Sequence, residues 1–467
     1  MTTVLAALPL LITVGCMVGR MKAHLAAVVS VILTLVIALG PLHVGTAPLL
    51  AGLGQIMPTL LEVVAILLGG VLLSQLLTTV GAQGRIAGWI GRVNAGSPDR
   101  AALLMVLGVT PFAESVTGFG MGAVVATPLL LRLGFGATKS IILALLGLFL
   151  TTWGALAPGT LVAAALGRVD VHELAVRSGL LALWPILVAA VATLLIVTGR
   201  RISPLLLVEA VVLALLEWAT LATANLLIGP ALAGAIAGLV ATLLMLGRLR
   251  LAGTSLAMDP ETARSLLPYG ILVVGLLGCT LGVRALGLTG PFTLLTHGSV
   301  WLGITCLSTG LLFHLPRDQA LPSLLKAVRS WWRVAVATGC FLAFGALFTA
   351  AGMSSTLATA LAGLGSGYLL LAPVLGGLSG FVAGSNAGAN AMFSASQAQT
   401  AAAVGASTLQ VVAVQNLTSG VLTIAAPSRV ALAVTMSPQA QPGPAYRWLL
   451  GIGTVVVAGM AAASFLG

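Results

Sequence analysis

Charged residues are what this sequence has least of. Only 7% of its 467 residues are charged, whereas 59% are hydrophobic. A soluble domain of this length could not hide so much apolar surface, so the composition excludes an ordinary soluble protein. It predicts an all-α polytopic membrane protein, in which each crossing uses about 20 apolar residues.

Several other absences narrow the function. The net charge of +11 comes without basic clusters interleaved with aromatic residues, which excludes a nucleic-acid-binding protein. The basic residues fall instead in short loops between apolar segments, as the positive-inside rule describes. No nucleophile–base pair, metal-ligand cluster or nucleotide fingerprint is found, so we expect neither an enzyme nor a bound cofactor or metal. The isolated cysteines are read as small buried hydrophobes: Cys16, Cys279, Cys306 and Cys340.

About 12 membrane crossings are predicted from the apolar segments. The loop 81–100 is basic and is assigned to the cytoplasm, which places the N-terminus outside. We expect a polar linker at 251–265 to separate an N-terminal half (1–250) from a C-terminal half (266–467), and a basic cytoplasmic segment at 317–333. The predicted apolar segments lie near 3–19, 23–40, 58–80 (after a shorter apolar run at 47–57), 137–153, 178–198, 203–220, 223–246, 266–287, 297–314, 334–351, 367–383, 407–424 and 446–466, with two helical pieces at 100–112 and 121–133 on either side of a glycine-rich break.

One stretch, 111–122, combines two features that membrane helices rarely tolerate. Glu114 lies four residues before Gly118-Phe119-Gly120. A carboxylate is costly in hydrocarbon and glycine weakens a helix. Irregular backbone at membrane depth is found only where it is buried in protein or lines a watery cavity. The stretch therefore predicts a broken helix at a transport site.

The second half of the chain repeats this pattern. Residues 380–393 form another run of small and polar residues between apolar segments, and the block 150–159 is matched by 417–428. Paired glycine and proline interruptions in two halves are a sequence pointer to the binding site of a secondary transporter. We therefore predict two internal repeats, inverted if each half crosses the membrane an odd number of times.

These blocks resemble the lactate permease family. Residues 111–122 are similar to that family's Glu-x-x-x-Gly-Phe-Gly segment, 384–393 to its Gly-Ser-Asp segment followed by Asn-Ala-x-Phe, and 416–428 to its later Asn-Thr-Ser-Gly and Ser-Pro-Gln segments. The resemblance covers about 100–170 and 376–435. It implies proton-coupled symport of L-lactate, D-lactate or glycolate in a bacterial inner membrane.

Two departures from the family keep an alternative open. Asn386 stands where the family has aspartate, and Arg429 follows Pro427 where a neutral residue is expected. The first removes a carboxylate that could carry a coupling ion. The alternative is transport of another organic anion, a dicarboxylate or a sulfonate, with sodium coupling. A lipid-modifying membrane enzyme and a channel are further alternatives.

The resulting site hypothesis assigns proton coupling to Glu114 and substrate contact to the polar residues of both breaks. A buried carboxyl group can carry a proton reversibly, although it can also pack as a neutral acid or pair with an arginine. Arg429 suits a carboxylate, with snorkelling to lipid phosphates as its rival role. Half-helix N-termini add anion affinity. The candidate substrate-binding residues are Ser115, Thr117, Gly118, Phe119, Gly120, Ser385, Asn386, Asn390, Asn416, Ser419 and Arg429.

The expected partners are a small organic anion, protons and the lipid bilayer. A role for Glu62, which lies within the third apolar segment, is left open between transport and structural pairing. The sequence also leaves open whether the protein forms a homo-oligomer.

Overall fold

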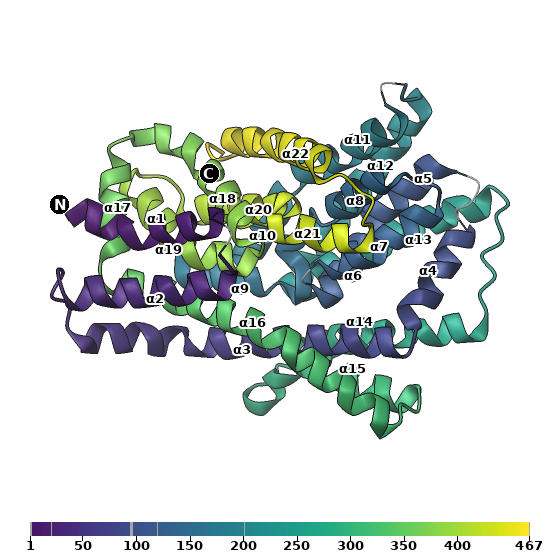
Figure 1. Cartoon of the computed structure of the whole chain (residues 1–467), viewed down its shortest axis with the longest axis horizontal. Helices are drawn as coiled ribbons and strands as arrows, with labels where there is room; N and C mark the ends of the chain where they lie inside the picture. Colours follow the sequence, from purple (N-terminus) through teal and green to yellow (C-terminus); the bar gives the residue numbers. More distant parts are fainter. Residues whose placement is uncertain (1, 20, 94–96, 119, 200, 467) are drawn as a thin grey trace.

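A computed structural model describes residues 2–19, 21–93, 97–118, 120–199 and 201–466 (Figure 1). These residues form helices and connecting loops, and no strand occurs among them. Ten of the helical segments are long and apolar enough to span a membrane, and six shorter apolar helices accompany them. The prediction of an all-α membrane protein is confirmed, while the number of crossings stays a prediction.

Four helices form the first part of the chain. Their bounds are Thr2–Val18 (α1), Ala23–Leu39 (α2), Thr46–Thr79 (α3) and Ala82–Val93 (α4). The prediction of two separate apolar pieces at 47–57 and 58–80 is wrong, because α3 continues through Pro58 as one 34-residue helix. Proline is tolerated inside membrane helices when neighbours satisfy the freed backbone group.

The next segments contain the first two interruptions. They are Pro98–Leu103 (α5), the π-helical Leu104–Val109, Thr110–Thr117 (α6), Met121–Arg132 (α7), Ala137–Leu146 (α8), the 3₁₀ helix Thr151–Leu156 and Pro158–Gly167 (α9). The predicted span 137–153 ends early, at Leu146. Gly147 follows and lies against α6, where an added Cβ would meet the Thr110 Cβ at 2.6 Å. This contact draws the chain out of its helix toward the first break.

A group of long helices leads to the middle of the chain. They are Val171–Leu181 (α10), Leu183–Thr198 (α11), Pro204–Leu227 (α12), Pro230–Leu251 (α13) and Pro260–Ala285 (α14). α14 begins at Pro260 rather than near 266, so only residues 252–259 of the predicted linker are non-helical, and the division into two halves stays a prediction. Asp259 caps α14 by accepting the Thr262 N–H at 2.8 Å, and proline at the first helical position suits a helix start.

The C-terminal part of the chain contains the remaining helices. Its elements are the 3₁₀ helix Gly290–Thr296, Gly298–Leu312 (α15), Arg317–Ala350 (α16), Met353–Ala362 (α17), Tyr368–Ala383 (α18), Asn386–Ala403 (α19), Thr408–Leu422 (α20), the 3₁₀ helix Thr423–Ala425, Pro427–Met436 (α21) and Pro442–Ala463 (α22). The basic segment 317–333, predicted as a separate cytoplasmic element, is the first half of α16. Lysine and arginine are good helix formers, so the charges do not end the helix.

Four interruptions of helical structure fall where the matched sequence blocks predict them. α6 ends before Gly118, and α9 begins at Pro158 after irregular backbone. In the second half, α18 ends before Gly384 and α21 begins at Pro427. The predicted broken-helix segments are therefore present in both halves. Their inverted relation stays a prediction.

Candidate functional site

The helix ends at these interruptions meet around one cavity of about 640 Å³. Figure 1 shows α6, α9 and α21 near the middle of the molecule, with α19 beside them. The cavity wall combines Gly118, which directly follows α6, with the first turns of α9, α19 and α21 and with residues of α2 and α16. Its lining includes Glu114, Gly118, Thr151, Gly154, Pro158, Gly159, Gly384, Ser385, Asn386, Ser428 and Arg429.

The first break depends on two glycines. Gly118 has φ 71° and ψ −166°, and Gly120 has φ 79°, a left-handed conformation. L-residues with side chains rarely adopt such angles. Space is also lacking at Gly118, where an added Cβ would approach the Ala155 Cβ to 2.4 Å. The backbone of this break therefore packs directly against the second interruption, at residues 154–157.

Glu114 joins the two sides of the first break. The residue is almost completely buried, with 1% of its surface exposed. Its carboxylate accepts the Gly120 N–H at 3.1 Å and the Gly122 N–H at 3.3 Å, and so caps the start of α7. The same carboxylate accepts a hydrogen bond from Arg429 Nη1 at 3.0 Å. A buried charge is tolerated when it is paired and hydrogen-bonded in this way.

Arg429 connects Glu114 to the second half of the chain. It lies in the first turn of α21 and is 6% exposed. Its Nε donates to the Gly384 carbonyl at 3.1 Å, and its Nη1 also lies 3.5 Å from Thr151 Oγ1. One guanidinium thus bonds three of the four interruptions. Among the described residues, none accepts a hydrogen bond from its Nη2.

Helix N-termini give the cavity a positive potential. Pro158 and Gly159 open α9, Ser385 caps α19, and Ser428 lies at the start of α21. Unpaired N–H groups and the helix dipole make such ends favourable for anions. Gly159 allows two of these ends to touch, because a Cβ there would lie 1.7 Å from Asn386 Oδ1.

An amide network lies behind the cavity wall. Asn386 Nδ2 donates to the Asn416 carbonyl at 2.8 Å and to Ser419 Oγ at 3.0 Å. Asn390 Nδ2 donates to Asn416 Oδ1 at 2.9 Å and to the Gly159 carbonyl at 3.0 Å. Of these residues Asn386 lines the cavity, while Asn390, Asn416 and Ser419 hold it in place from the side away from the cavity.

The structure brings together most, but not all, of the predicted site residues. Gly118, Ser385, Asn386 and Arg429 line the cavity with Glu114, and Gly120 bonds that carboxylate. Ser115 is buried against α13, where a Cβ on Gly234 would lie 2.5 Å from its Oγ. Thr117 donates to the Ala113 carbonyl at 2.6 Å. Neither lines the cavity, and Phe119 lies outside the described residues.

Sequence reasoning missed several residues that the structure places at or beside the site. His24, Arg333, Thr151, Gly159 and Ser428 line the cavity, and Thr160 Oγ1 accepts from Asn416 Nδ2 at 3.2 Å. Thr151, Gly159, Thr160 and Ser428 belong to or adjoin the matched blocks 150–159 and 417–428, whereas His24 and Arg333 lie outside them. The blocks were used to recognise the repeat, and the same pattern could have indicated the four residues in or beside them as part of the site.

A second cavity lies behind the strained backbone at 155–157. It also measures about 640 Å³, and its lining includes Glu62, Leu156, Leu161, Arg284 and His297. Ala155, Leu156 and Ala157 have φ of 51°, 62° and 63°, which side chains rarely adopt. Gly154 and Ala155 face the first cavity, and Leu156 faces the second. This short segment is therefore a shared wall of the two cavities.

Glu62 has partners of its own in the second cavity. Its carboxylate lies 3.0 Å from His297 Nδ1 and accepts hydrogen bonds from Ser299 Oγ at 3.0 and 3.1 Å. Within the described part of the chain, no three His, Cys, Asp or Glu side chains come together as metal ligands.

Comparison with known proteins supports the predicted resemblance. A profile described as L-lactate permease matches residues 288–441. The chain is 45% identical to the L-lactate permease of Escherichia coli strain K12 over 83 residues, which are 18% of this chain and 15% of that relative. It is 23% identical to the L-lactate permease of Streptococcus iniae over 434 residues, 85% of this chain and 90% of that relative.

One solved structure resembles this chain, with lower sequence identity than the permeases above. It is the crystal structure of the Alcanivorax borkumensis YdaH transporter, described as having an unusual topology, with a TM-score of 0.46 and 16% identity over 88% of this chain and 86% of that one. Permeases are transporters rather than enzymes. The profile match covers the segment 384–428 from which the resemblance was read, and the chain is similar in sequence to L-lactate permeases.

Proposed function

We propose that this protein is a secondary transporter that carries a small 2-hydroxy monocarboxylate, such as lactate or glycolate, together with a proton. The buried Glu114–Arg429 pair carries this proposal, because it sets an acid and a carboxylate-binding group side by side in the wall of the cavity. The substrate class follows from the name of the relatives. The chemistry of the cavity is compatible with it.

The cavity suits a small carboxylate. Arg429 lines it with an Nη2 that no described residue engages, and three helix N-termini add partial positive charge. A guanidinium binds a carboxylate best through two parallel N–H groups. In the structure one of these groups, Nη1, is held by Glu114 at 3.0 Å. The hydroxyls of Ser385 and Ser428 are neutral partners for the substrate hydroxyl.

Coupling follows from competition for Arg429. With Glu114 ionised, the pair is neutral and the guanidinium is occupied. A substrate carboxylate entering the cavity would add a negative charge to a site of low dielectric, which is costly. Protonation of Glu114 weakens its bond to Nη1 and restores neutrality once the anion binds. One proton and one anion therefore bind together, and the loaded site has the same net charge as the empty one.

Access from two sides has a structural counterpart in the two cavities. They share the wall formed by residues 154–157, in which the left-handed backbone of residues 155–157 is strained. Strained backbone is found at switch regions, where the surrounding packing holds it. We assign the first cavity to substrate binding and the second to the route on the opposite side of that wall.

Replacement of Glu114 by glutamine tests the coupling role. In proteoliposomes, Glu114→Gln should abolish lactate accumulation driven by a proton gradient and leave lactate exchange measurable. Glutamine keeps hydrogen-bonding capacity, but its amide does not take up or release a proton during transport. Glu217→Gln is the matched control: Glu217 is also fully buried but does not line the cavity, so coupling should persist.

Normal proton-driven accumulation by Glu114→Gln would refute the assignment. The sodium-coupled alternative is tested in the same vesicles. Uptake that requires a sodium gradient at fixed pH, with no response to a proton gradient, would replace proton coupling by sodium coupling.

A further inference from the structure

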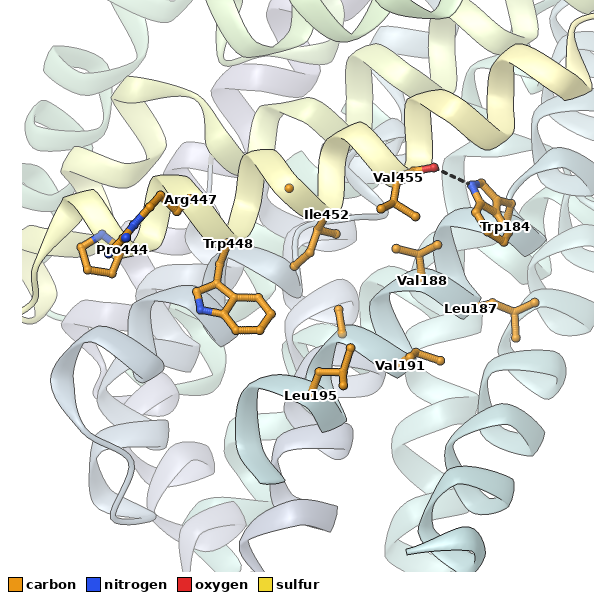
Figure 2. A pocket seen from close by; sticks show the side chains of 12 residues that line it. Trp184, Leu187, Val188, Val191, Leu195, Pro444, Arg447, Trp448, Ile452 and Val455 are labelled. Atoms are coloured by element: carbon orange, nitrogen blue, oxygen red, sulfur yellow. Dashed lines mark hydrogen bonds between the residues drawn. The ribbon is translucent and has the colours of Figure 1, made fainter. Parts of the chain in front are cut away.

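A long apolar groove runs between α11 and α22, away from the substrate cavity. It measures about 790 Å³. Figure 2 shows its two walls: valine and leucine side chains of α11 face Ile452, Val455 and Trp448 of α22. Four of the lining residues are exposed to at least 36%: Trp184, Leu195, Trp448 and Val455. The groove is therefore apolar and open on the outside of the helix bundle.

The groove has one polar end. Arg447 lines it beside Trp448, at the N-terminal part of α22 (Figure 2). Arg447 is exposed, and no described residue accepts a hydrogen bond from it. At the other end the indole Nε1 of Trp184 donates to the Val455 carbonyl at 3.2 Å, so its donor is already used. A ligand in this groove meets an available cation at one end and hydrocarbon along the rest.

A second cation lies near the same end. The Gln441 N–H donates to Thr138 Oγ1 at 3.0 Å, which places the exposed Lys139 close to the start of α22. The two helices are antiparallel, because Trp184 at the start of α11 contacts the later turns of α22. None of the groove-lining residues carries a carboxylate.

We propose that this groove binds an anionic phospholipid, with an acyl chain along α11 and α22 and the phosphate at Arg447. Apolar area and volume favour an acyl chain, and the basic end, defined by Lys139 and Arg447, favours a negative headgroup. Tryptophan at the boundary between an apolar and a polar zone is typical of the membrane interface. The start of α22 adds its positive dipole end.

Two substitutions separate the headgroup from the acyl chain. Arg447→Gln removes the charge at the polar end. Gly451→Leu fills the groove, because no heavy atom lies within 4 Å of a Cβ built at Gly451 and the side chain therefore enters the open space. Gly278→Leu on α14 is the matched control, since its Cβ also meets nothing within 4 Å and it does not line the groove.

The experiment measures lipid binding to the purified full chain by native mass spectrometry and by thermal shift, using phosphatidylglycerol and phosphatidylcholine with the same acyl chains. Phosphatidylglycerol should bind about tenfold more tightly and give the larger rise in melting temperature. Arg447→Gln should remove the preference, and Gly451→Leu should remove binding of both lipids at this site. Gly278→Leu should behave like the unmodified chain.

Three results would overturn the proposal. The first is unchanged phosphatidylglycerol preference in both groove variants. The second is equal stabilisation by inorganic phosphate, which would indicate a free-anion site without a lipid. The third is a loss of oligomer in Gly451→Leu with no change in lipid preference, which would indicate that a second copy of the chain covers the groove. The melting temperature of each variant without added lipid shows whether it folds.

Discussion

At the scale of single residues, the burial of Glu114 and the burial of Arg429 are each made possible by the ion pair between them. Glu114 is held by two backbone N–H groups of the α7 start, and Arg429 by the Gly384 carbonyl. Each is therefore fixed by the break on its own side, and the 3.0 Å contact between them joins the two halves of the chain. The carboxylate that caps the helix after the break is thus also the group that we propose binds the coupling proton.

The pair predicts a stability effect that depends on both partners. Arg429→Gln leaves the buried Glu114 carboxylate without its counter-charge and should destabilise the protein by about 3–5 kcal/mol. The double variant Glu114→Gln/Arg429→Gln removes both charges and should recover most of that loss. Both variants should lose substrate-induced stabilisation, since each lacks the guanidinium.

Thermal unfolding in detergent at neutral pH, with and without lactate, measures both effects. A double variant as unstable as Arg429→Gln alone would show that the two side chains do not act as a pair. The control is Arg447→Gln, which removes an exposed arginine and should leave the melting temperature without lactate nearly unchanged.

Sequence reasoning selected both members of this pair but not the bond between them. Glu114 stood out because charge is rare in membrane segments, and Arg429 because it interrupts a neutral block. Their partnership depends on how two breaks 315 residues apart meet in space, which local patterns do not encode. Ser115 and Thr117 were predicted as neutral polar side chains beside the break, yet the turn of α6 directs them away from the cavity.

At the scale of elements, the interruptions were predictable and their form was not. Glycine and proline indicated breaks near 118, 158, 384 and 427, and the structure has breaks there. The left-handed run Ala155-Leu156-Ala157 carries no glycine and gives no sequence signal. Packing holds it: Leu156 lies against Gly298 of α15, where an added Cβ would come within 2.8 Å of its Cδ1.

The position of Leu156 in the wall between the two cavities predicts that this side chain limits the leak of substrate. Leu156→Ala removes most of the side chain that closes the wall between the two cavities, so we expect an uncoupled leak of lactate from preloaded vesicles several-fold above that of the unmodified chain. Leu161→Ala is the control, because Leu161 lines the second cavity but lies within the regular helix α9.

Efflux of labelled lactate without a proton gradient measures the leak. Equal efflux from Leu156→Ala and Leu161→Ala would mean that the wall does not depend on this side chain. Loss of all transport in Leu156→Ala, with a normal melting temperature, would instead assign Leu156 to the moving part of the cycle rather than to closure.

At the scale of the whole molecule, hydropathy gave the class and misplaced the ends of the longest helices. α3 and α16 lie side by side as 34-residue helices (Figure 1), although Pro58 and the basic residues before Arg333 suggested boundaries. Their packing against each other stabilises both beyond what local propensity predicts. The repeat could be predicted because its sequence signal is the glycine and proline residues at the breaks, which does not depend on helix lengths.

The repeat makes a further prediction about the two sides of the membrane. The loops 133–136 and 404–407 occupy matching places, each between the helix that follows a first break and the helix that leads to the second. Each contains a left-handed glycine, Gly134 with φ 88° and Gly405 with φ 72°. Arg132 and Lys139 flank the first loop, whereas the second has no lysine or arginine beside it. If the repeats are inverted, the loops lie on opposite sides, with the basic one in the cytoplasm.

Single cysteines at Gly136 and Ser407, the residues that precede α8 and α20, test this arrangement in a background without the four native cysteines. A membrane-impermeant maleimide should label Gly136→Cys only in inside-out vesicles and Ser407→Cys only in right-side-out vesicles. Labelling after detergent solubilisation shows that both thiols are reactive. If both sites react from the same side, the repeats are parallel, and the substrate cavity cannot alternate between the two sides by exchange of equivalent halves.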